Sequence, residues 1–120
     1  MILLNKKMVV SDIDKEGKLY SNVSRAYLKA DDSTEIVLDY HSILLRISKD
    51  DVLYLQLFEG EEKVECEYQM NGMVYKIEDL DGRVEVWISF GGLLMIQKIA
   101  KDQIVGLNDR SRVSLAISKV

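Results

Sequence analysis

The stretch from Arg83 to Ile96 constrains the fold of this chain more than any other. Apolar residues occupy alternate positions in its first half: Val84, Val86, Ile88 and Phe90. A period of two is the pattern of a β-strand that buries one face. The pair Gly91-Gly92 then separates this run from a second apolar run, which predicts a tight turn, a bulge or a barrel corner. A phosphate-binding loop is disfavoured, because such loops lead into a helix and no helix-capping residue follows.

Short alternating runs with regular turn signals continue along the rest of the chain. There is no proline, so glycines and short polar pairs mark the turns. We expect further strands at residues 1–11, 19–30, 35–40, 43–48, 53–58, 68–80 and 112–120. Residues 97–109 lack a period and are predicted to cross the surface, with a helical turn near 101–105. About eight or nine strands with little helix predict an all-β fold, and an antiparallel barrel is favoured over a sandwich.

Three turn-like segments carry separate expectations. Asn71-Gly72 is interpreted either as a hairpin turn or as a bulge within one long strand, and Asp81-Gly82 as a hairpin. The acidic segment Glu59–Glu67 is expected to be an exposed loop. Asp12 to Gly17 begins like a calcium-binding EF-hand loop, but Val23 stands where the closing glutamate would fall, so we expect a solvated turn.

Composition places the chain among globular proteins and limits its function. The 120 residues are 48% hydrophobic, which predicts one folded domain over residues 1–120. A net charge of −4 argues against a free-standing nucleic-acid binder. No apolar run is long enough to span a membrane. The single cysteine, Cys66, fits a reducing compartment, so we expect a cytosolic or nuclear protein.

No arrangement typical of an enzyme is visible. His41 is the only histidine, so a closed zinc site cannot be assembled, and we expect it to lie at a strand end. We predict no catalytic residue, no metal and no cofactor. Six tyrosines, Trp87 and two phenylalanines suit base stacking, but lysines and arginines form no stripe. Direct nucleic-acid binding is therefore the weaker interpretation.

Four segments, in one collinear order, resemble a known family. They are Asp12-Ile13-Asp14 with Val23-Ser24-Arg25, Met70-Asn71-Gly72 with Tyr75, Ser89 to Met95, and Ser111-Arg112-Val113. Together they resemble the eighth subunit of RNA polymerase II, the small common subunit shared by RNA polymerases I, II and III. Asn71 stands where this family usually has tyrosine, Lys15 replaces a common proline, and the loop Glu59–Glu67 is shorter than usual.

The resemblance implies a fold and a role. The fold would be an eight-stranded antiparallel barrel of the oligonucleotide-binding-fold type. The role would be non-catalytic: docking on the largest polymerase subunit and supporting assembly, in the nucleus and nucleolus, without direct contact to nucleic acid or membrane.

Two sets of residues follow from the same motifs. One segment is expected either to form the partner contact or to fix the barrel corner behind it, and comprises Phe90, Gly91, Gly92, Leu93, Leu94 and Met95. The others are expected to be structural: Val23, Ser24, Arg25, Gly72, Tyr75 and Arg112. The alternatives are an independent single-stranded nucleic-acid-binding barrel and, less favoured, an unrelated adaptor domain.

Overall fold

Eight antiparallel strands form a closed barrel in the computed structural model, which describes residues 2–18, 20–100 and 108–120. The strands are β1 (Ile2–Ile13), β2 (Val23–Lys29), β3 (Glu35–His41), β4 (Val52–Glu59), β5 (Tyr68–Leu80), β6 (Arg83–Phe90), β7 (Leu93–Ala100) and β8 (Arg112–Lys119). The described residues contain no helix. This confirms the predicted all-β barrel of eight strands and is consistent with the oligonucleotide-binding-fold type.

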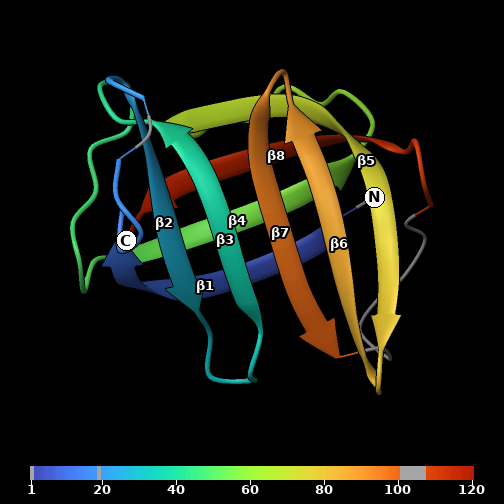
Figure 1. Cartoon of the computed structure of the whole chain (residues 1–120). Coiled ribbons are helices and arrows are strands. Elements are labelled where there is room, and N and C mark those ends of the chain that lie inside the picture. The colour runs from blue at the N-terminus through green and yellow to red at the C-terminus, as the bar shows by residue number, and fades with distance from the viewer. Residues whose placement is uncertain (1, 19, 101–107) are drawn as a thin grey trace.

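Around the barrel the strand order is β1-β2-β3-β7-β6-β5-β8-β4 (Figure 1). Strands β2, β3, β7 and β6 run side by side at the front of Figure 1, and β1, β4 and β8 cross behind them. The two longest strands belong to both layers. β1 pairs first with β4 and then with β2, while β5 pairs first with β8 and then with β6. Each of them bends, and a register shift interrupts the second pairing of each.

The core lies inside the barrel and is built from alternate residues of every strand. Leu53, Leu55 and Leu57 of β4 point inward and are fully buried. Ser24, Ala26 and Leu28 of β2 also form one buried face. The alternation therefore identifies the inward positions, because successive side chains of a strand point to opposite faces.

Three strand predictions differ from the structure. The segment 43–48 is a turn and loop, so that prediction is wrong. Its alternation arises because Leu45 is buried in the core and Ile47 packs against it, while Ile43 and Leu44 are exposed. Residues 20–22 precede β2 and make only an isolated bridge from Tyr20 to Val23. Residues 97–100, predicted to cross the surface, belong instead to β7, so that part of the prediction is wrong. The period of β7 is hidden in the sequence because one of its inward positions holds the polar residue Gln97, which is buried. The helical turn expected near 101–105 lies outside the described residues.

The turns resolve two open alternatives. Asp81-Gly82 and Gly91-Gly92 are both hairpin turns, and all four residues have positive φ, from 50° to 103°. This is the backbone geometry that suits the twist of two-residue hairpins. Asn71-Gly72 is not a hairpin, because β5 continues without interruption through these two residues. The bulge of that strand falls instead at Tyr75, between the paired residues Val74 and Lys76.

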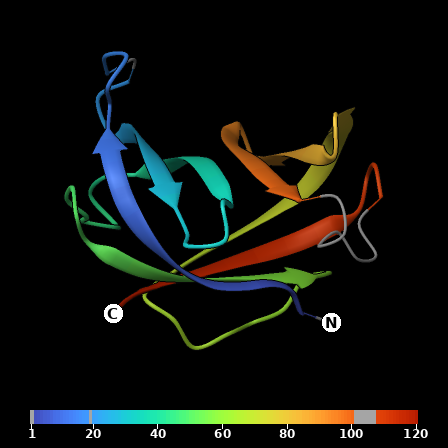
Figure 2. The same cartoon turned by 90° about the horizontal axis from the view of Figure 1, so that it is seen from below.

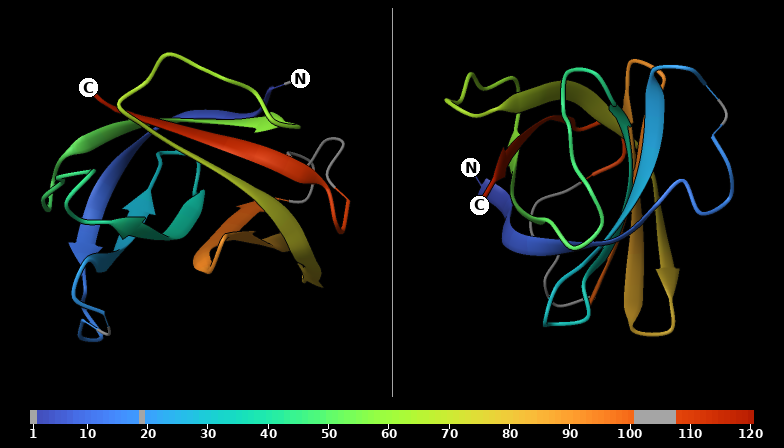
Figure 3. Two further views of the ribbon diagram at one scale, coloured as in Figure 1. Left: turned by 90° about the horizontal axis from the view of Figure 1, so that it is seen from above. Right: turned by 90° about the vertical axis from the view of Figure 1, so that its left-hand side faces the viewer.

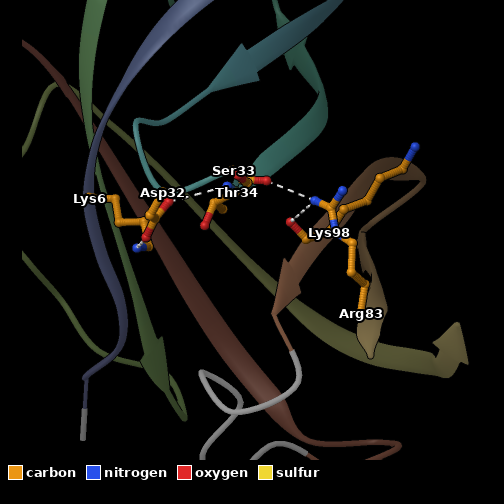
Figure 4. Close-up of polar contacts among 6 residues, drawn as sticks. All are labelled: Lys6, Asp32, Ser33, Thr34, Arg83 and Lys98. Carbon is orange, nitrogen blue, oxygen red and sulfur yellow. Dashed lines mark hydrogen bonds and ion pairs between the residues drawn. The ribbon is translucent and has the colours of Figure 1, made fainter. Parts of the chain in front are cut away.

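The turn between β2 and β3 is held from both sides (Figure 4). On one side Lys6 of β1 forms an ion pair with Asp32, whose other carboxylate oxygen accepts a hydrogen bond of 3.2 Å from the backbone N–H of Thr34. On the other side the Arg83 guanidinium of β6 donates to the Ser33 carbonyl at 2.8 Å. The turn thereby connects β1 to β6 across the end of the barrel. Mainly because Lys6 hydrogen-bonds to it, the pKa of Asp32 lies well below its usual range.

We expect Asp32→Asn to lower the free energy of unfolding at about pH 7 by less than about 1 kcal/mol, because a partly exposed ion pair is screened by solvent. The folded-state pKa of Asp32 is depressed, so its contribution is complete above the unfolded value of about 3.9 and is lost as pH falls toward the folded value. In urea denaturation, the difference between wild type and variant should shrink below about pH 4 and on adding salt. A difference that stays constant down to about pH 2 would contradict this assignment.

A loop connects β4 to β5 and arches across the outside of the barrel (Figures 2 and 3). It corresponds to the predicted Glu59–Glu67 loop, and most of its residues are exposed as expected. It also covers the outer face of β8, where Ser114 and Ala116 are buried. The Ser114 hydroxyl joins strand and loop, because it accepts from the Glu62 N–H at 3.0 Å and donates to the Gly60 carbonyl at 2.8 Å. Small outward side chains on β8 leave room for this cover.

Candidate protein-docking surface

The β6–β7 hairpin divides the predicted partner-binding segment into core and surface. Phe90 is 6% exposed and Met95 is fully buried, so both belong to the core. Gly91 and Gly92 form the exposed turn, and Leu93 and Leu94 are half-buried. Leu93 also packs against the core cluster. Within this segment, Leu94 and the glycine turn are therefore what a partner could contact.

Asp39 connects this hairpin to the Arg25 motif. Backbone pairing between β3 and β7 ends at Leu38 and Met95. Next to that last pair, the Asp39 carboxylate links the two strands instead, because it accepts a hydrogen bond of 3.1 Å from the Leu94 N–H. It also accepts hydrogen bonds of 2.7 and 3.2 Å from the Arg25 guanidinium. This hydrogen bonding with Asp39 raises the pKa of Arg25. Asp39 is only 8% exposed, so it forms a semi-buried junction between β2, β3 and β7.

Sequence reasoning missed Asp39. The only signal was an acidic residue inside the apolar run of β3, and that signal alone does not name a partner.

Gly72 brings β5 against the same hairpin. A side-chain carbon at this position would lie 2.3 Å from the Ser89 carbonyl oxygen and 2.6 Å from a ring carbon of Phe90. Such distances are far inside van der Waals contact, so only glycine fits. The Gly72 motif and the Ser89–Met95 motif, which are separated in sequence, are thus in direct contact.

The bulge of β5 turns Tyr75 toward the outer face. Tyr75 is 47% exposed and meets the Trp87 ring edge-on, with ring centroids 6.4 Å apart. The Lys76 ammonium lies 5.0 Å from the centre of the same Trp87 ring and pairs with Glu78 at 3.2 Å. The bulge therefore places two aromatic rings and a cation together beside the hairpin, where Tyr75, Ser89, Gly92, Leu93 and Leu94 line a shallow hollow.

An apolar row crosses the outer face of the front layer. Its members are half-buried and lie directly opposite one another on neighbouring strands: Tyr27 of β2, Val37 of β3, Ile96 of β7 and Trp87 of β6. We use the name docking face for this row together with Tyr75 and Leu94. A second row is charged. It lies two residues away from the first on each of these strands, continues onto β5, and consists of Lys29, Glu35, Lys98, Glu85 and Glu78. The docking face is thus an apolar strip with a charged border, the composition of a protein interface.

The remaining predicted residues lie around or away from this face. Ser24 is buried and hydrogen-bonds Tyr40, and Val23 is half-buried at the start of β2. Arg112 does not join the face: it lies on β8, exposed, and pairs with Glu61 at 3.3 Å. The structure therefore brings together Arg25, Gly72, Tyr75 and the hairpin. Arg112 is paired through its backbone with Met73, next to Gly72, but its side chain bonds to Glu61 of the β4–β5 loop.

His41 ends β3, as predicted, and its Nδ1 accepts the backbone N–H groups of Ile43 and Leu44, both at 3.3 Å. Among the described residues, no group of three or more His, Cys, Asp or Glu side chains is placed to hold a metal ion. The described part of the chain also has no helix long and apolar enough to cross a membrane.

Comparison with known proteins gives consistent matches. The family model described as RNA polymerase Rpb8 matches residues 59–119. A Schizosaccharomyces pombe protein named DNA-directed RNA polymerases I, II, and III subunit RPABC3 is 33% identical over 100 residues, covering 78% of this chain and 78% of that protein. A Caenorhabditis elegans protein named as the probable form of the same subunit is 30% identical over 118 residues, covering 78% of this chain and 80% of that protein.

Among solved structures, the cytoplasmic molybdate-binding protein ModG aligns over 96% of this chain and 89% of its own, with a TM-score of 0.39 and 15% identity. A likeness this low carries no argument. The curated relatives and the family model are similar enough to assign a family, and they confirm the resemblance found in the sequence motifs. The chain belongs to the RNA polymerase Rpb8 family.

Proposed function

We propose that this chain is a non-catalytic common subunit of the DNA-directed RNA polymerases, that it docks on the largest subunit, and that it supports assembly and stability of the enzyme. The active site would lie in other subunits, and the chain would act in the nucleus, including the nucleolus. The names of the relatives support this role, since they describe subunits of RNA polymerases I, II and III.

The observation that carries the docking proposal is the docking face. Single exposed apolar residues are common on soluble proteins, whereas a continuous row across four strands that contains two aromatic rings, with the Tyr75 ring beside it, suits a partner. Tryptophan and tyrosine are enriched among the residues that dominate interface energies. The family motifs around Arg25, Gly72 and Gly91-Gly92 border this face, and they contain both core and surface residues.

The first test is affinity purification of the tagged full chain from native extract at moderate salt, with mass spectrometry of the recovered proteins. We expect the two largest polymerase subunits in stoichiometric amounts. Recovery of the chain alone would contradict the proposal.

Leu94→Asp is expected to reduce recovery of polymerase at least about tenfold, because a charge in a desolvated interface is left unpaired. Leu94 is half-buried on the outside of the barrel, so the isolated variant should remain folded, which thermal denaturation checks. Leu94→Gln repeats the test without adding a carboxylate beside Asp39.

Leu44→Asp is the matched control, since Leu44 is exposed in the turn after β3 and outside the docking face. It should leave polymerase recovery unchanged. Equal losses for Leu44→Asp and Leu94→Asp would reject the docking face, and unfolding of both Leu94 variants would assign Leu94 to the core instead.

A second candidate function is binding of single-stranded nucleic acid, favoured by the aromatic rings of Tyr27, Tyr75 and Trp87 on an outer sheet face. The charged border disfavours this function, because its three glutamates, Glu35, Glu78 and Glu85, outnumber its two lysines and repel phosphates. Titration of the isolated chain with a single-stranded oligonucleotide at several salt concentrations decides: salt-dependent binding would favour this function over docking.

A further inference from the structure

A small hollow lies beside the docking face, between the β1–β2 loop and strands β2 and β3. Its main lining side chains are Asp14, Glu16, Tyr20, Arg25, Tyr27 and Asp39, and we call it the β1–β2 pocket. Its volume of about 190 Å³ is well below the roughly 300 Å³ at which pockets for drug-sized ligands begin. The pocket therefore has room for one long side chain rather than for a cofactor.

The charge of the pocket is negative. It contains three carboxylates and one guanidinium, and that guanidinium is already paired with Asp39. Burial, followed by the Glu16 charge, raises the pKa of Tyr27. The loop holds these groups in place, since the Asp14 carboxylate accepts the Arg25 N–H at 2.9 Å and the Asp14 N–H donates to the Arg25 carbonyl at 2.8 Å. The excess negative charge disfavours a phosphate or a nucleotide and favours a cation.

Two tyrosines supply aromatic surface for such a cation. Tyr20 is 69% exposed at the rim of the pocket. Tyr27 lines both this pocket and the neighbouring hollow, and on the side of that hollow the Lys15 ammonium lies 4.1 Å from the ring centre. The chain itself thus shows that the Tyr27 ring attracts a cation. Lys15 does not line the β1–β2 pocket, which leaves that pocket free to receive a cationic group from outside.

We propose that the β1–β2 pocket receives an arginine side chain of the polypeptide that binds the docking face. A planar guanidinium can stack on tyrosine and donate to carboxylates at the same time, which an ammonium does less well. The pocket is continuous with the docking face, because Tyr27 belongs to both and Asp39 bonds to the Leu94 N–H. This inference deepens the proposed docking function and rests on it for the identity of the partner.

The experiment is an NMR titration of the isotope-labelled full chain with the peptide acetyl-Gly-Arg-Gly-amide. We expect saturable shifts of the Gly17, Tyr20, Arg25 and Tyr27 resonances. The same peptide with citrulline has nearly the same shape but no charge, and should produce no such shifts. Equal shifts with the citrulline peptide, or shifts outside the pocket only, would overturn the proposal.

Two variants test the residues. Glu16 and Tyr20 lie at the exposed rim, so the double variant Glu16→Gln with Tyr20→Ala should stay folded and bind the arginine peptide about tenfold more weakly. Glu65→Gln makes the same acid-to-amide change in the exposed β4–β5 loop and should bind like wild type. Unchanged binding by the double variant would also overturn the proposal.

Polymerase recovery separates this proposal from the one on which it rests. If the wild-type chain binds the arginine peptide as described but recovers no polymerase, the pocket stands and the docking function fails. If polymerase is recovered equally with wild type and the double variant at raised salt, docking stands and the arginine contact fails.

Discussion

Replacing Gly72 with alanine is expected to lower the free energy of unfolding by at least about 3 kcal/mol, near the upper end for an overpacked core. The added carbon would lie 2.3 Å from the Ser89 carbonyl oxygen, which belongs to a strand paired on both sides and cannot simply rotate away. β5 and β6 must then separate, which also displaces the Phe90 ring. Urea denaturation of both proteins measures the loss.

Gly60→Ala is the control for Gly72→Ala. Gly60 has a φ of 80° but no neighbouring atom within 4 Å of an added carbon, so alanine there carries only the left-handed backbone penalty of about 1 kcal/mol. At Gly72 the reverse holds: its φ is not positive, so the backbone suits alanine, but there is no space for the added side-chain carbon. Equal losses for the two variants would mean that β5 does not approach β6 as closely as described.

Asp39→Ala is expected to lower the free energy of unfolding by about 2–3 kcal/mol, because it leaves both the Leu94 N–H and the Arg25 guanidinium without their acceptor. Asp39→Asn should cost less, since its amide oxygen can still accept one of these hydrogen bonds. The difference between the two variants estimates how much of the effect is ionic. Chemical denaturation measures all three proteins.

Glu61→Ala is the control for Asp39→Ala, since it breaks a second arginine–carboxylate ion pair, between Arg112 and Glu61. Both of those side chains are about two-thirds exposed, so the expected loss is below about 0.5 kcal/mol. If Asp39→Ala cost no more than this, Asp39 would not join the three strands. In addition, Asp39→Ala should increase hydrogen exchange at Leu94 more than at Val86 in the middle of β6.

The local pattern of the chain predicted most of the fold. The hairpin at Asp81-Gly82 and the buried face of β6 follow from turn chemistry and period alone, because both act over a few residues. At Gly91-Gly92 the same signals left a tight turn, a bulge and a barrel corner open. The segment 43–48 shows the limit. Two residues packed against the core, Leu45 and Ile47, are enough for a loop to imitate the alternation of a strand. Whether a segment finds a partner strand is decided by distant parts of the chain.

The candidate site was less predictable than the fold. Sequence reasoning selected the Phe90–Met95 segment but could not separate buried Phe90 and Met95 from half-buried Leu94, because a turn at a barrel corner presents both kinds of residue. The outer apolar row was missed, since its members come from four strands and become neighbours only through the β3–β7 pairing. That pairing joins residues about 60 positions apart, beyond any local signal.

The loop over β8 has a consequence for how this family can diversify. It is held at a few points, chiefly through Ser114 and through the Glu67 carboxylate, which accepts the Lys119 N–H at 3.0 Å. Extra residues inserted between these points would extend into solvent and leave the barrel untouched. Doubling the length of a flexible loop costs only about 0.6 kcal/mol in closure entropy. Evolution can therefore lengthen or shorten this segment to gain or lose contacts, while the eight strands remain as they are.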